Sequence, residues 1–194
     1  MMPESFKNKS IPKIFLAMAL VSFLAAWPLW AQNTPQGSAQ DREDEILFKQ
    51  LKAETKKDDA QIYQSIGFGY FQQEKFDRAM FYFQRAVRLN PKLFWSWYYM
   101  GLMNLSDPET YFKNAIQANK QFAPARYWLA RYYCKAQKTK DSLQTFDDYL
   151  RLAQGDPNEE SRMAVARHFV EMMKSGETDF NKIVKSSPAN TPRS

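Results

Sequence analysis

The sequence contains one cysteine and one histidine, and this scarcity excludes several kinds of site. Cys134 alone cannot form a disulfide or a thiolate metal cluster within the chain, and His168 alone cannot build a multi-histidine metal site. The six glycines form no phosphate-cradling loop. The acidic pairs Asp147–Asp148 and Glu159–Glu160 are sequence neighbours, so on a helix their side chains diverge and make no catalytic dyad. We therefore expect no metal, no cofactor and no enzymatic activity.

The charge of the chain is only weakly unbalanced, although the formal net charge is +6. Lys7, Lys9 and Lys13 fall within the segment 1–31 against the single acid Glu4. The remainder holds 24 basic and 20 acidic residues, a net charge of +4. Binding driven by phosphate groups needs a more concentrated basic surface, so we expect no nucleic-acid partner.

Residues 1–31 have the pattern of a secretory signal peptide. Lysines precede an uncharged run from Ile14 to Trp27, and Ala31 is a small residue in front of the polar Gln32. The run is short for a bilayer span, which needs about 20 residues. We predict export and cleavage after Ala31, with the periplasm of a bacterial envelope as the destination. The alternative is an uncleaved anchor that uses the whole segment from Ile14 to Ala31.

A repeat is the main feature of the middle of the chain. Gly67 and Gly101 are one period of about 34 residues apart, and Phe112 is followed by another phenylalanine after the same interval. In contrast, the intervals from Phe83 to Phe112 and from Gly101 to Ala130 are each five positions shorter. A single deletion of that length between Gly101 and Phe112 accounts for all four spacings. Such a period is typical of paired-helix repeats.

Residues 60–93 resemble a tetratricopeptide repeat (TPR). The positions that match the pattern are Tyr63, Ile66, Gly67, Tyr70, Ala79, Phe83, Ala86 and Pro91. Residues 94–122 and 123–156 resemble further, partial copies. The resemblance implies an all-α fold, an α-α superhelix of three TPR-like helical hairpins over residues 60–156.

Segments on both sides of the repeats complete the expected organisation. Residues 32–40 are polar and predict a linker, and residues 41–59 predict a flanking helix with acids in its first turn. Apolar residues at helical spacing predict a C-terminal capping helix at 157–175. Residues 176–194 have few apolar groups and predict a disordered tail.

The resemblance also implies a concave groove lined by the first helix of each pair. The residues it places there are Gln64, Phe68, Phe71, Trp95, Tyr98, Leu102, Tyr127, Arg131 and Lys135. This groove has an aromatic floor and a basic end, which suits a protein or peptide partner with apolar anchors and acidic groups. Some of these aromatic side chains belong to the core in an alternative interpretation. The residues that grip a C-terminal carboxylate in some TPR modules are absent.

The role of Cys134 has two interpretations. It is either a small buried apolar residue or an exposed thiol whose pKa is lowered by Arg131 and Lys135. For the whole chain, we predict a scaffold that binds a partner protein in the bacterial cell envelope. The alternatives are a self-associating structural component that forms a homo-oligomer, and a scaffold tethered to the membrane by its N-terminal segment.

Overall fold

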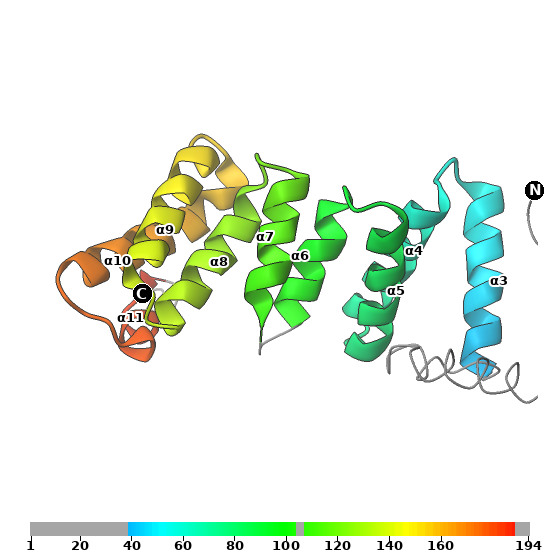
Figure 1. The fold of residues 1–194 in the computed structure, drawn as a ribbon, viewed down its shortest axis with the longest axis horizontal. Coiled ribbons are helices and arrows are strands. Elements are labelled where there is room, and N and C mark those ends of the chain that lie inside the picture. The colour runs from blue at the N-terminus through cyan, green and yellow to red at the C-terminus, as the bar shows by residue number, and fades with distance from the viewer. Residues whose placement is uncertain (1–38, 104–106, 189–194) are drawn as a thin grey trace, which may run out of the picture. The chain divides into compact units, whose positions relative to one another are not determined.

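The computed structural model describes residues 39–103 and 107–188, and in these ranges the only regular secondary structure is helical (Figure 1). The predicted signal peptide at 1–31 and linker residues 32–38 lie outside the described residues, as do residues 189–194 at the end of the predicted tail. None of the described helices is both long enough and apolar enough to cross a bilayer.

The chain divides into two compact units, Met1–Leu47 and Phe48–Ser194. Helix α3 (Ala39–Glu54) crosses this division and corresponds to the flanking helix expected at 41–59. Asp41 lies in its first turn, where a negative charge is favoured by the helix dipole. The second unit contains all of the remaining helices of the described chain.

Three consecutive helix pairs form the main part of the second unit. Each helix packs against its pair partner, and neighbouring pairs pack against each other (Figure 1). The pairs are α4 (Asp59–Gln72) with α5 (Phe76–Leu89), α6 (Phe94–Met103) with α7 (Pro108–Ala118), and α8 (Ala123–Lys135) with α9 (Thr139–Ala153). The predicted all-α fold of stacked helical hairpins is confirmed.

Small residues allow the two helices of a pair to approach closely. A Cβ atom built on Gly67 would lie 2.9 Å from Cδ1 of Phe83, and one built on Gly101 would lie 2.6 Å from Cε1 of Phe112. The same glycine-to-phenylalanine contact is therefore made in both pairs, across a sequence interval that is five positions shorter in the second. This difference is the deletion that the spacing predicts.

The core lies between the stacked helices, where the largest fully buried side chains are aromatic. Phe83, Phe146, Tyr149 and Phe169 are fully buried. Burying one such side chain stabilises the fold by roughly 1.5–3 kcal/mol. Ser142 is also fully buried, and its hydroxyl donates a 2.8 Å hydrogen bond to the Ala130 carbonyl oxygen, which joins α9 to α8.

The C-terminal end of the repeats is covered by a short 3-10 helix (Pro157–Glu159) and by α10 (Glu160–Lys174). Beyond them, the structure differs from the disordered tail expected at 176–194, because Phe180–Lys185 form helix α11. The Asp179 carboxylate caps this helix by accepting hydrogen bonds from two backbone N–H groups. Ile183 is fully buried in the same core cluster as Phe169 of α10. The apolar face of α11 is only one turn long, too short for sequence periodicity to reveal.

Candidate functional site: the face formed by α4, α6 and α8

Helices α4, α6 and α8 are the first helices of the three pairs, and together they carry all nine predicted groove residues. Two hollows collect six of these side chains. The first, of about 190 Å³, is lined by Gln64, Ser65, Phe68, Trp95 and Tyr99. The second, of about 370 Å³, is lined by Gly101, Leu102, Pro108, Phe112, Trp128, Arg131, Tyr132, Lys135 and Phe180.

An aromatic cluster centred on Tyr99 forms the first hollow. The Tyr99 ring centroid lies 4.8 Å from that of Phe71, 5.2 Å from that of Phe68 and 5.9 Å from that of Trp95. Phe68 is 37% exposed and Trp95 is 41% exposed, so two large rings present their surface to solvent. The rings therefore pack against one another and form a continuous apolar surface.

A polar contact joins the first two pairs beside this cluster. The buried Ser96 hydroxyl donates a 3.0 Å hydrogen bond to the side-chain carbonyl oxygen of Gln64. Gln64 is therefore a partly buried connection between α4 and α6 that also forms part of the wall of the first hollow.

Arg131 is the main charged group of the second hollow, and aromatic rings surround it. Its guanidinium carbon lies between 5.1 and 5.7 Å from the ring centroids of Tyr127, Trp128, Phe169 and Phe180. One guanidinium nitrogen donates a 3.1 Å hydrogen bond to the Tyr127 hydroxyl group. The buried Nε–H of Arg131 has no hydrogen-bond partner among the described residues.

Tyr98 and Tyr127 are corrections to the predicted groove, because both are core residues that are 7% and 4% exposed. Tyr98 packs against Phe122 and accepts a 3.2 Å hydrogen bond from the indole N–H of Trp128, and its burial raises the pKa of its hydroxyl. Tyr127 packs against Tyr149 at 5.3 Å between ring centroids. Both rings stabilise the core and leave little surface for a partner.

Cys134 is buried, and its thiol does not have the lowered pKa of the reactive alternative. Burial raises the pKa of the thiol to about 11, and the nearby charge of Arg131 offsets only part of this effect. A thiol in this environment is protonated and unreactive near neutral pH. Its position agrees with the interpretation of Cys134 as a small apolar core residue.

Sequence reasoning missed Tyr99, Trp128 and Phe180 as members of the two hollows. Tyr99 lies four positions after Trp95, and Trp128 lies three positions before Arg131, so helical spacing was an available signal for both. Phe180 had no such signal, because it belongs to the short helix in the predicted tail.

Other polar side chains of the described residues make their contacts outside the two hollows. Within the described ranges, no three His, Cys, Asp or Glu side chains gather as metal ligands would. Glu159 is buried and accepts a 2.8 Å hydrogen bond from the Tyr149 hydroxyl, whereas Glu160 is exposed. The His168 ring lies 2.9 Å from the Ser186 hydroxyl oxygen, a contact that joins α10 to the end of α11.

Comparison with known families gives a match to residues 60–93, which fit the family model described as Tetratricopeptide repeat. No curated protein matches the chain. The matched residues include α4, the turn after it and α5, so they correspond to the first helix pair. Repeats of this family act in general as protein–protein interaction modules, and they are typically not catalytic. Residues 60–93 are therefore assigned to the tetratricopeptide repeat family, in agreement with the resemblance of this segment.

Proposed function

We propose that the chain binds a partner protein along the face formed by α4, α6 and α8, as a scaffold in the bacterial cell envelope. The observation that carries this proposal is the exposure of Phe68 and Trp95 around the Tyr99 ring. Removing large apolar rings from water is favourable, so an exposed and ordered ring cluster gains free energy when a partner covers it.

Truncating one side chain of this surface should produce a measurable loss of binding free energy. A few aromatic and arginine side chains commonly supply most of the binding free energy, and truncating one costs about 2 kcal/mol. Trp95 is such an aromatic side chain. It is 41% exposed, so a partner can cover it, and its ring packs against those of Tyr99 at 5.9 Å and Phe122 at 4.7 Å. We expect Trp95 to make the largest single contribution on this face.

The test is affinity capture from native envelope extract, with the wild-type protein and Trp95→Ala compared side by side. Leu89→Ala is the matched control, because Leu89 is a 58% exposed apolar residue on α5. A partner retained by the wild type and by the control should bind Trp95→Ala about 30-fold more weakly in a titration. Equal capture by all three proteins would refute the proposal.

The envelope setting is a separate part of the proposal and is supported by the signal-like pattern at residues 1–31. The mass of the mature protein tests it directly. A chain that begins at Gln32 agrees with export and cleavage, whereas a chain that retains residues 1–31 in the membrane fraction identifies the tethered alternative. An unprocessed chain in the cytoplasmic fraction contradicts both.

A further inference from the structure

The geometry points to a specific ligand for the second hollow, the one lined by α6, α7, α8 and α11: an acidic side chain of the partner, held by Arg131, next to a bulky apolar side chain that fills the pocket. This inference rests on the proposed function and adds the chemistry of the bound segment.

The first argument is the unbalanced charge of Arg131. A guanidinium group is always protonated in proteins, and a charge removed from water is costly unless an opposite charge or hydrogen bonds compensate it. Among the described residues, Arg131 donates to the neutral Tyr127 hydroxyl, its Nε–H is unpartnered, and no carboxylate lies within ion-pair distance. Four aromatic rings surround the guanidinium group and no acid lines the hollow, so an incoming carboxylate would meet a strong and specific partner.

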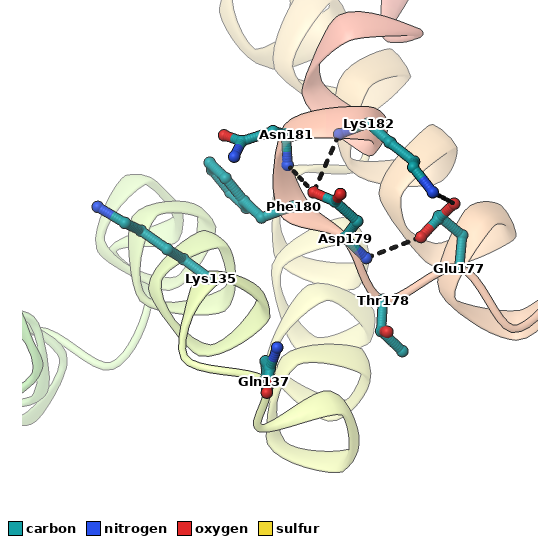
Figure 2. A pocket seen from close by; sticks show the side chains of 8 residues that line it. All are labelled: Lys135, Gln137, Glu177, Thr178, Asp179, Phe180, Asn181 and Lys182. Carbon is teal, nitrogen blue, oxygen red and sulfur yellow. Dashed lines mark hydrogen bonds and ion pairs between the residues drawn. The ribbon is translucent and has the colours of Figure 1, made fainter.

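The second argument is that nearby charges do not neutralise this site. Lys135 lies one helical turn after Arg131, is exposed and lines the same hollow, whose lining contains no acid. The acids in the turn before α11 are engaged there, as Figure 2 shows. Glu177 accepts a 2.8 Å hydrogen bond from the Asp179 backbone and lies 3.7 Å from the Lys182 ammonium group, and Asp179 caps α11. The site is therefore complementary to an external anion.

The third argument is the apolar wall around the charge. Leu102, Phe112, Trp128 and Phe180 line the hollow, whose volume is about 370 Å³. That volume lies at the small end of the range for ligand pockets and suits one or two side chains. A segment with a carboxylate beside a bulky apolar group satisfies both features of the hollow.

The last argument concerns the path of the bound chain. A third hollow of about 560 Å³, drawn in Figure 2, shares Lys135 and Phe180 with the second. Its other lining residues are polar: Gln137, Glu177, Thr178, Asp179, Asn181 and Lys182. A peptide can continue from one hollow into the other past the Phe180 ring. Continuity of this kind favours a side-chain carboxylate within the segment over a carboxylate at its end.

The test starts with a selection from short random peptides displayed with blocked C-terminal ends, using the full mature chain as bait. The proposal expects the enriched peptides to share an acidic residue within two positions of a bulky apolar residue. Enrichment of peptides without acids would overturn it. The strongest peptide is then synthesised with its acid and with the matching amide, Glu→Gln or Asp→Asn, each with a free and an amidated C-terminus.

The affinities of the wild-type protein and of Arg131→Gln are then measured for the acid and amide forms of the peptide, which gives a double-mutant cycle. The acid-to-amide change and Arg131→Gln should each weaken binding by about tenfold or more, and together they should cost little beyond either one. Lys140→Gln is the control with the same charge change, because Lys140 is exposed and outside the hollows. Additive losses, or a loss that follows only the terminal carboxylate, would overturn the assignment.

One further variant and two further outcomes keep the test decisive. Lys135→Gln alters an exposed side chain and should weaken binding severalfold without changing the melting temperature, which covers the case in which Arg131→Gln does not fold. Peptides that need Trp95 but bind equally with and without Arg131 would refute this pocket and leave the proposed function standing. Self-association of the chain that Arg131→Gln abolishes, seen by light scattering, would also refute it, because a second copy would then be the occupant of the hollow.

Discussion

The Glu109 carboxylate, in the first turn of α7, accepts a 3.0 Å hydrogen bond from the Lys138 ammonium group, which precedes α9. The same carboxylate accepts hydrogen bonds from Lys113 at 2.6 Å and from the Tyr133 hydroxyl at 3.1 Å. These contacts tie the second helix pair to the third. The hydrogen bonds from Lys113 and Lys138 lower the pKa of Glu109 from 4.5 to about 2.

This lowered pKa predicts a pH window for stability. A carboxylate with a lowered pKa in the folded state stabilises the fold above its ordinary pKa of 4.5, and this stabilisation disappears as the pH falls through about 2. Glu109→Gln should therefore lower the free energy of unfolding by about 1 kcal/mol near neutral pH, with the difference from wild type shrinking below pH 4.5. Urea unfolding at a series of pH values measures this. Glu160→Gln, which changes an exposed acid on α10, is the control, and an equal loss in both variants would contradict the role of Glu109.

Variants at two glycines of α4, Gly67 and Gly69, test how closely α4 and α5 must pack. A side chain at Gly67 would collide with the Phe83 ring, whereas a Cβ atom on Gly69 meets nothing within 4 Å. We expect Gly67→Leu to destabilise the protein by about 1–3 kcal/mol or more through overpacking. Gly69→Ala should stabilise it by roughly 0.5–1 kcal/mol through the helix propensity of alanine. Thermal unfolding followed by circular dichroism measures both, and similar melting temperatures for the two variants would contradict this account.

The buried thiol of Cys134 predicts slow chemical modification of the native protein. Its pKa is raised to about 11 by burial, so the fraction of thiolate near neutral pH is very small. Reaction with a disulfide reagent should be slow in buffer and fast in denaturant, with the colour of the released thiolate as the readout. Rapid reaction of the folded chain would mean that Cys134 is accessible, as the redox interpretation requires.

The docking of α11 predicts a local effect of substitutions at Ile183. Ile183 is fully buried, and replacing it with aspartate would place a charge among apolar neighbours. Ile183→Asp should therefore release α11 and make the chain sensitive to limited proteolysis between Ser175 and Pro188, while most of the helical signal remains. Lys185→Asp changes an exposed position on the same helix and should be cut no faster than wild type. Equal digestion of Ile183→Asp and wild type would show that α11 does not depend on this side chain.

The helix pairs could be predicted because their determinants are local and repeated. Gly67, Phe83 and their counterparts recur at related spacings, and even the shortened second pair is visible in those spacings. Burial of individual groove residues depends on contacts between pairs, which spacing does not encode. Tyr98 is covered by Phe122 and by Trp128, and both of these belong to a later part of the chain.

The composition of the second hollow was equally hidden. The presence of Leu102, Arg131 and Lys135 could be predicted from their positions in the repeats, but one wall of the hollow comes from outside the repeats. Phe180 reaches the hollow because Ile183 anchors a short helix in the core cluster around Phe169. The sequence after α10 does not predict a buried helix, because its apolar side chains are outnumbered by polar ones.

The contribution of α11 has a consequence for ligand preference. Residues inside the stacked pairs pack against many neighbours, so substitutions there disturb the packing of the repeats. In contrast, the six residues of α11 touch few other elements, yet Phe180 borders the hollow around Arg131. Under the proposed function, exchanging this one appended turn would change the ligand preference of the hollow while leaving the repeats unchanged.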